Sequence, residues 1–192
     1  MANNRKTEIR VFTIADYEEE EVWLREQHRQ GWKLVSTNLP VFYHFVRCEP
    51  EDVVYRLDYK NSKEDRSYMQ MFEDYGWEYF NDCIGWLYFR KPAADMDSDM
   101  EEEIFSDNES KLEFLNHIIK TRMIPLLIIF FLCLLPQWLN VIDRSMDAGI
   151  DVVLFVIFSL LMLIYLYLFI HCGRKMLKLR KKYKNCYKKI IL

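Results

Sequence analysis

Residues 123–142 read MIPLLIIFFLCLLPQWLNVI, and residues 152–170 read VVLFVIFSLLMLIYLYLFI. Neither stretch contains a charged side chain. At a rise of about 1.5 Å per residue, each is long enough to cross the roughly 30 Å hydrocarbon core of a bilayer. Buried helices of soluble proteins rarely stay uncharged and apolar on every face over this length. We therefore expect two transmembrane helices, over residues 123–142 and 152–172.

The first apolar stretch carries two prolines and two amide side chains. Pro125 falls in the first turn, where a missing N–H is harmless, whereas Pro136 falls in the last turns with Gln137 and Asn140. We expect this helix to kink or to end early near Pro136. Trp138 would then lie at the level of the lipid headgroups.

The segments around the two apolar stretches predict the orientation of the hairpin. Residues 143–151 make a connection too short for anything but a turn between antiparallel helices, and we expect it to be an extracellular loop. Basic residues precede the hairpin over residues 107–122 and follow it over residues 173–192. Positive charge resists translocation, and residues 1–122 contain no pattern of a secretory signal peptide. We therefore expect a multi-pass cell membrane protein with both termini in the cytoplasm.

The basic tail, residues 173–192, contains no acidic residue and repeats apolar residues at helical spacing. Such a helix can bind the anionic lipids of an inner leaflet, where each Lys or Arg contributes about 1 kcal/mol. Simple anchoring of the hairpin and contact with the acidic linker are the alternatives. The candidate membrane-surface residues are Arg174, Lys175, Lys178, Arg180, Lys181, Lys182, Lys184, Lys188 and Lys189.

The formal net charge of -3 hides an uneven distribution. Residues 1–110 carry 13 basic and 25 acidic side chains, whereas residues 111–192 carry 13 basic and 4 acidic ones. An acidic N-terminal part disfavours nucleic acid as a partner. Residues 93–106 are acidic without a basic residue, which is typical of a solvated linker, and residues 107–122 predict an amphipathic juxtamembrane helix.

The N-terminal part, residues 1–92, predicts the same series of elements twice. Gly31-Trp32 recurs as Gly76-Trp77 at an offset of 45 residues, each after a helix-like segment. The first series comprises a strand at 8–14, a helix at 17–30, and strands at 32–37 and 42–47. The second comprises a strand at 53–59, a helix at 63–75, and strands at 77–81 and 86–90. We predict an α+β cytosolic domain built as a tandem βαββ repeat.

Residues 1–92 contain 18 aromatic side chains, more than one small core needs. Some could line an apolar cleft between the repeats, and the candidates are Trp32, Phe42, Trp77 and Trp86, which begin equivalent strands. The alternative is that the aromatic residues fill the core and cover a half-exposed sheet.

No arrangement typical of catalysis or metal binding is found in the sequence. His44 and Cys48 are four residues apart on a predicted strand, roughly 13 Å, which is too far to share a metal. The acidic run from Glu18 to Glu21 opens a helix, where acids complement the helix dipole. There is no CxxC, HExxH or phosphate-binding glycine loop, and the five cysteines are odd in number and widely spaced. We predict no enzyme activity, no cofactor, no metal and no disulfide framework.

The Gly-Trp repeats, the strand ends at Phe45-Val46-Arg47 and Tyr88-Phe89-Arg90, and the membrane pair together resemble a bacterial domain-of-unknown-function family of membrane proteins. That resemblance implies a gene neighbourhood with PadR-type repressors and a link to an envelope or stress response. The duplicated βαββ order is also similar to the ferredoxin-like and GyrI-like folds. In the GyrI-like group, an aromatic cleft binds amphipathic cations.

Two functions are compatible with these features. The first is a non-enzymatic, membrane-anchored regulatory or adaptor protein whose cytosolic domain engages a protein partner at the inner leaflet, with homo-oligomerisation possible. The second is a sensor of an apolar or cationic small molecule that binds in the aromatic cleft.

Overall fold

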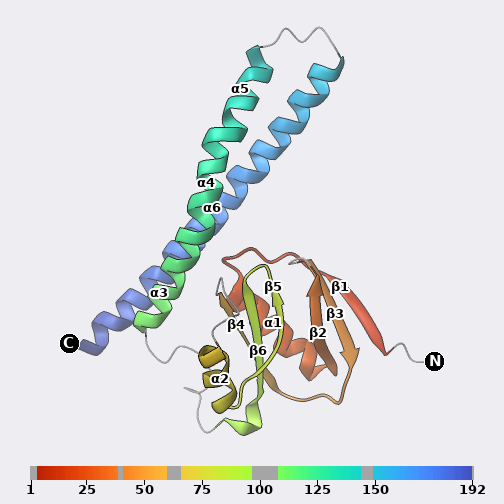
Figure 1. The fold of residues 1–192 in the computed structure, drawn as a ribbon, viewed down its shortest axis with the longest axis vertical. Coiled ribbons are helices and arrows are strands. Elements are labelled where there is room, and N and C mark those ends of the chain that lie inside the picture. The colour runs from red at the N-terminus through yellow and green to blue at the C-terminus, as the bar shows by residue number, and fades with distance from the viewer. Residues whose placement is uncertain (1–3, 39–40, 60–65, 97–107, 144–148, 192) are drawn as a thin grey trace. The chain divides into compact units, whose positions relative to one another are not determined.

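The computed structural model describes residues 4–38, 41–59, 66–96, 108–143 and 149–191. The chain divides into two compact units, Met1–Ser106 and Asp107–Leu192 (Figure 1). The first, termed the N-terminal unit, is α+β. The second, termed the helical unit, consists of helices among its described residues.

The N-terminal unit contains two series of strand, helix, strand and strand. The first series is β1 (Arg5–Ile9), α1 (Tyr17–Arg29), β2 (Trp32–Asn38) and β3 (Phe42–Arg47). The second is β4 (Val53–Tyr59), α2 (Arg66–Asp74), β5 (Glu78–Cys83) and β6 (Trp86–Pro92), followed by a short 3-10 turn, η2 (Ala93–Asp95). Each series forms a three-stranded antiparallel sheet, in the orders β1-β3-β2 and β4-β6-β5. The α+β class and this element order agree with the sequence prediction.

The backbone repeats its irregular features at the same offset as the Gly-Trp pairs. Gly31 and Gly76 both have positive φ, 81° and 77°, and each amide N donates to the carbonyl three residues earlier at 2.8 Å. A left-handed residue after a helix is the position that glycine tolerates best. The register of β2 shifts between Leu34 and Ser36, and that of β5 shifts between Tyr79 and Asn81, again 45 residues on.

The first strand lies further toward the N-terminus than residues 8–14. β1 pairs with β3 from Arg5 opposite Val46 to Ile9 opposite Phe42, where β3 begins. Phe12 leaves the sheet, and its ring packs against Trp23 of α1 at a centroid distance of 5.6 Å. The apolar alternation over residues 8–14 therefore reflects packing on a helix as well as a strand.

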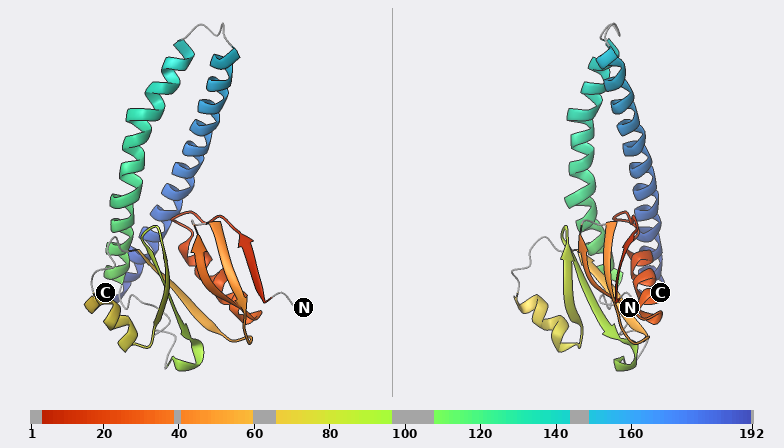
Figure 2. Two further views of the ribbon diagram at one scale, coloured as in Figure 1. Left: turned by 45° about the vertical axis from the view of Figure 1, so that its right-hand side comes forward. Right: turned by 90° about the vertical axis from the view of Figure 1, so that its right-hand side faces the viewer.

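Each helix covers its own sheet. Trp23 of α1 packs edge-on against Tyr43 and Phe45 of β3, at centroid distances of 4.9 and 5.7 Å. α2 covers the second sheet through a core cluster composed of Val54, Phe72, Trp77, Leu87 and Phe89. Figure 2 shows α1 and the two sheets from two further directions. β2 and β5 lie side by side, where the Asn81 side-chain amide donates to the Thr37 hydroxyl at 2.7 Å.

The helical unit is an antiparallel pair. Its first arm runs through α3 (Asn108–Ile118), a π-helical turn η3 (Ile119–Met123), α4 (Ile124–Ile129), a second π-helical turn η4 (Phe130–Leu134) and α5 (Leu135–Asp143). Its second arm is the single helix α6 (Gly149–Ile191). The first arm continues through Pro136, so the predicted early end is wrong. The π-helical turn before Pro136 is a usual adjustment to a proline without an N–H.

The two arms contact each other at several levels. Phe130 stacks on Tyr165 at a centroid distance of 5.8 Å, and Trp138 Nε1 donates to Ser159 Oγ at 3.1 Å. Towards the other end, α3 and α6 pack through apolar side chains that the structure buries: Phe114, Leu115, Ile118, Met176, Leu179 and Tyr183. The apolar stripes that the sequence predicted for the juxtamembrane helix and the tail therefore pack on each other.

Two helices are long and apolar enough to cross a membrane, Lys111–Ile142 and Val152–Lys184. Within the most apolar 18-residue window of each, only 6% of the window is buried. Large aliphatic side chains are exposed instead, with Leu132 at 71% and Leu163 at 65%. A core helix of a soluble protein would be mostly covered by protein, so this exposure favours contact with lipid.

Candidate functional site

The α1 helix contacts both sheets of the N-terminal unit. Trp23 packs on the first sheet, whereas Glu20 and Glu21 of α1 bind β6 and β4 of the second sheet. A helix with sheets on two sides buries two stripes of side chains instead of one. Polar residues on the second stripe must then find partners inside the protein.

Glu20 accepts two hydrogen bonds in the interior. Its Oε1 accepts from the Tyr43 hydroxyl at 2.9 Å and from the Tyr88 hydroxyl at 2.8 Å, so one carboxyl group links α1, β3 and β6. Burial raises the pKa of Glu20 to about 7, because desolvation outweighs the two hydroxyl donors. Burial and the nearby Glu20 also raise the pKa of Tyr88 well above its usual value.

Glu21 binds the outer edge of the second sheet. Its Oε1 accepts from the backbone N–H of Leu57 in β4 at 2.8 Å, and its Oε2 accepts from Arg56 at 3.0 Å. Burial raises the pKa of Glu21 to about 8, and Arg56 and the amide oppose the shift only in part. The acidic run opens α1 as the sequence predicted, but Glu20 and Glu21 are also buried and bind both sheets, which the helix-dipole reading did not include.

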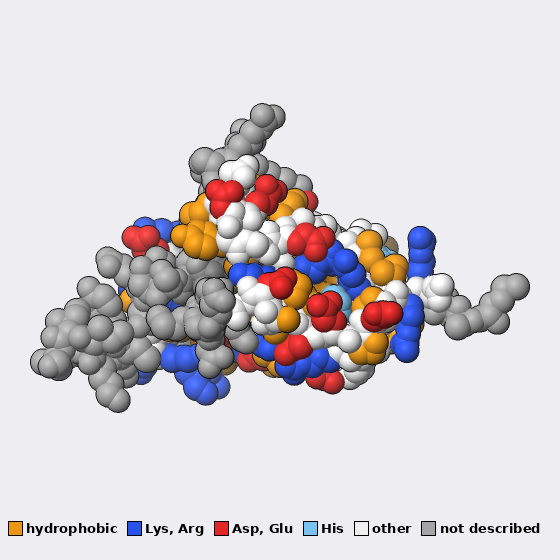
Figure 3. Space-filling view, turned by 90° about the horizontal axis from the view of Figure 1, so that it is seen from below, with side chains coloured by type: hydrophobic (Ala, Val, Ile, Leu, Met, Phe, Trp, Pro, Cys, Tyr) orange, Lys and Arg blue, Asp and Glu red, His pale blue; other side chains and the backbone are white. Residues whose placement is uncertain are grey.

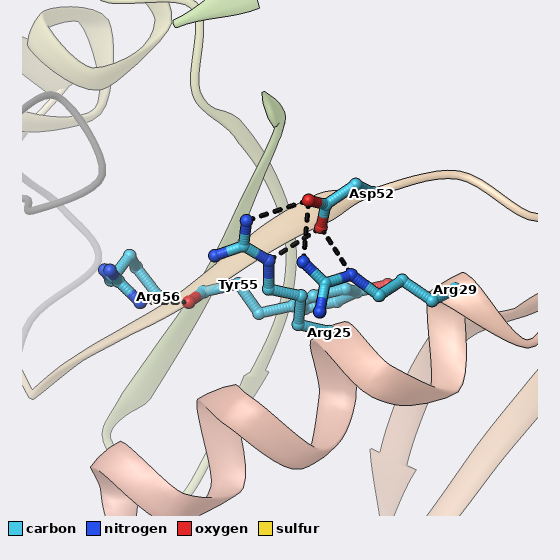
Figure 4. A network of polar contacts seen from close by, with 5 residues as sticks. All are labelled: Arg25, Arg29, Asp52, Tyr55 and Arg56. Atoms are coloured by element: carbon cyan, nitrogen blue, oxygen red, sulfur yellow. Dashed lines mark hydrogen bonds and ion pairs between the residues drawn. The ribbon is translucent and has the colours of Figure 1, made fainter. Parts of the chain in front are cut away.

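Asp52 joins α1 to the start of β4 at the surface. Two guanidinium groups of α1 bind this carboxylate, Arg25 at 2.6 and 2.9 Å and Arg29 at 3.0 and 2.7 Å (Figure 4). Paired forks of this kind fix orientation as well as distance. The hydrogen bonds from the two arginines hold the pKa of Asp52 well below its usual range.

His28 lies at the end of α1 against the second sheet. Its Nδ1 lies 2.8 Å from the Tyr55 hydroxyl of β4. Burial and the nearby Arg90 lower the pKa of His28 to about 4. Arg90 itself binds Glu78 and donates to the carbonyl of Leu34 at 3.0 Å, which ties β6 to β2.

This polar network holds the two halves of the unit together. Among the described residues every buried side-chain N or O atom has a hydrogen-bond partner, and no group of three or more His, Cys, Asp or Glu could hold a metal ion. Glu20 and Glu21 both accept hydrogen bonds from groups of the protein itself. The arrangement therefore supports a structural role for these acids.

The four aromatic residues predicted to share a cleft lie in different places. Trp77 is in the core under α2, and Trp86 is buried on the other face of the second sheet, where it stacks on Tyr17 at 5.9 Å. Trp32 lies between the cations of Lys6 and Arg47, 4.7 and 4.9 Å from its ring centroid. The fourth, the Phe42 ring, is on the opposite face of the first sheet from α1. The structure does not bring the four rings together.

The first sheet leaves one face open. On β1 and β3, the cross-strand pairs Arg5–Val46, Thr7–His44 and Ile9–Phe42 point away from α1, and Ile9 and Phe42 are 72% and 38% exposed. We term this the open face. The equivalent face of the second sheet is buried, with Tyr55, Leu57, Tyr59, Trp86 and Tyr88 packed beneath α1.

Sequence reasoning missed the open face because the expected strand at 8–14 did not include Arg5 and Thr7. The nearest signal was Phe42, which was proposed for a cleft. On the described part of the face drawn in Figure 3, acidic and basic side chains are interspersed, with apolar ones among them.

The basic tail follows the second apolar stretch without a break in α6. Met176 and Tyr183 are buried against α3, and Lys111 of α3 lies 5.3 Å from the Tyr183 ring centroid. The basic side chains that the structure describes thus project from a helix pair. The side chains of Lys188 and Lys189 lie outside the described residues.

Comparison with known proteins places the chain in a family. No curated protein and no solved structure matches it. A family model described as "Protein of unknown function (DUF2812)" matches residues 16–128, which include most of the N-terminal unit and the first part of the helical unit. The matched segment is more than half of the chain, and the chain therefore belongs to the DUF2812 family.

Proposed function

We propose that this chain is a non-enzymatic, membrane-anchored regulatory or adaptor protein whose N-terminal unit binds a protein partner at the cytoplasmic surface. The observation that carries the proposal is the open face. Ile9 and Phe42 are exposed on a sheet whose other face is covered, and the equivalent face of the second sheet is buried by a helix. Apolar side chains that are exposed next to each other on a sheet face can mark an interaction site.

Membrane anchoring is supported by the two uncovered apolar helices. Orientation is proposed from charge, because Lys120 and Arg122 of η3 precede the first apolar stretch and the basic residues of α6 lie in its second half, beyond the second apolar stretch. Reporter fusions at Ala148 and Leu192 test this topology. An external C-terminus would overturn it.

Anionic lipid is proposed as a second partner of the basic tail. The apolar stripe of the tail packs on α3, so the lysines and arginines would bind headgroups from an upright helix pair rather than from a helix lying on the leaflet. This role is supported if the tail binds vesicles that contain anionic lipid but not neutral vesicles, and if the binding weakens as the salt concentration rises.

Family resemblance supplies the remaining parts of the proposal. The twofold βαββ order supports a ferredoxin-like or GyrI-like repeat, and a neighbouring PadR-type repressor would place the protein in an envelope or stress response. The ligand-sensor alternative is tested by tryptophan fluorescence of the purified chain with a panel of amphipathic cations. A saturable change would favour it.

The adaptor proposal is tested from the open face itself. A photo-crosslinking amino acid replaces Phe42 in the full-length chain in membranes, and the matched control carries it at Val22, an exposed position of α1. We expect a discrete protein adduct from position 42 and none from position 22. No adduct from position 42 would overturn the proposal.

A further inference from the structure

One helix of this fold, α1, packs on two sheets through its two faces. Trp23 packs on its own sheet. On the other side, His28 contacts Tyr55, and Glu21 accepts from the N–H of Leu57, so the face of the second sheet is covered by the preceding helix. Within the N-terminal unit the order is therefore first sheet, α1, second sheet, α2 (Figure 1).

α2 repeats the first of these two sides, and the described side chains at the end of its second side are exposed. At the offset of 45 residues, Tyr68 corresponds to Trp23, and its ring packs beside Phe72 of the core cluster. Glu73 corresponds to His28, and its carbonyl accepts from the N–H of Gly76 just as that of His28 accepts from Gly31. The side chains of Glu73 and Asp74 are exposed.

The open face of the first sheet is equivalent to the face of the second sheet that α1 covers, but no described helix covers it. The β1–β3 and β4–β6 registers place Arg5 at the position of Tyr55, because Arg5 pairs with Val46 and Tyr55 pairs with Arg90. The same registers place Ile9 at the position of Tyr59 and Phe42 at that of Trp86. Tyr59 and Trp86 are buried, whereas Ile9 and Phe42 are exposed. Arg5 is exposed and lies in one cross-strand row with Lys33.

We propose that the open face binds α2 of a second copy of this chain, which continues the alternation of sheets and helices from one copy to the next. Glu73 of one copy then lies opposite Arg5 of the other. This carboxylate–guanidinium pair occupies the position that the His28–Tyr55 pair occupies between α1 and the second sheet. Neither Arg5 nor Glu73 has an ion-pair partner among the described residues. The inference rests on the proposed function, since it names the partner of the open face. The contact is heterologous, so it propagates along the membrane or closes into a ring.

Disulfide trapping between two copies tests the contact. Two differently tagged full-length chains are co-expressed in membranes, one with Arg5→Cys and the other with Glu73→Cys, and mildly oxidised. We expect a heterodimer that contains both tags. The matched control pairs Val22→Cys with Glu73→Cys, and each variant expressed alone measures the background from native cysteines. A yield no higher than these controls would overturn the proposal.

A charge swap tests the same pair without new thiols. We expect Arg5→Glu and Glu73→Arg each to lower copy-to-copy crosslinking by about fivefold, because each sets like charges opposite one another. The double variant R5E/E73R, which restores opposite charges, should recover most of the yield. No recovery would contradict the pairing.

The photo-crosslinker at position 42 separates this inference from the proposed function. An adduct with a second copy supports both. An adduct with a different protein overturns the second-copy inference and leaves the adaptor role in place. No adduct overturns both.

Discussion

Replacing Glu20 by Gln is expected to remove a pH-dependent loss of stability from the N-terminal unit. Because burial raises the pKa of Glu20 from 4.5 to about 7, the folded protein keeps a proton that the unfolded chain releases above pH 4.5. This contribution to stability is present in full below pH 4.5 and is lost as pH rises to about 7. At about 1.4 kcal/mol per pKa unit, the interval amounts to about 3 kcal/mol.

A glutamine oxygen can accept from both Tyr43 and Tyr88, as the carboxyl oxygen does, but it never carries charge. We expect E20Q to match the wild-type free energy of unfolding at pH 4 and to exceed it by about 3 kcal/mol at pH 8. The matched control is Glu19→Gln, one residue away on α1 and exposed, which should follow the wild type.

The assay is urea unfolding of the full-length chain in detergent micelles, at pH 4, 6 and 8. Tryptophan fluorescence reports on the N-terminal unit, because four of the five tryptophans lie within residues 1–96. The difference between E20Q and the wild type isolates this carboxyl from other titrating groups. Parallel pH curves for the two proteins would show that Glu20 is not protonated in the folded state, and the reasoning would fail.

Three further variants test other parts of the structure. Gly31→Ala should destabilise more than Gly76→Ala in urea unfolding: both residues have positive φ, but a Cβ at position 31 would lie 2.9 Å from a backbone carbonyl oxygen, and equal losses would contradict this. Ile84 has φ 48° in the hairpin turn between β5 and β6, a conformation that asparagine tolerates better than a β-branched residue. Ile84→Asn should therefore raise the free energy of unfolding by about 1 kcal/mol, which is measured as a higher midpoint urea concentration. Met176→Glu should cost about 3 kcal/mol and speed hydrogen exchange in α3, whereas Leu177→Glu, at an exposed position, should not; equal effects would refute the packing of α3 on α6.

Local sequence patterns predict most of the elements, although the first strand lies at Arg5–Ile9 instead of 8–14. Two uncharged stretches of bilayer length determine the hairpin, because length and the absence of charge are properties of the chain alone. The Gly31 and Gly76 repeats locate the two helix ends, because a left-handed residue is a local requirement. The predicted strands at 42–47 and 53–59 coincide with β3 and β4.

Which surfaces meet depends on contacts between residues far apart in the sequence. The acidic run that begins α1 has the same helix propensity whether solvent or a second sheet lies beside it, so burial of Glu20 and Glu21 could not be predicted from spacing. Likewise, the equivalent positions Phe42 and Trp86 differ in exposure because only the second sheet has a helix from the preceding repeat on that face. Periodicity identifies the apolar face of each element, but the partner that covers it is set by contacts distant in sequence.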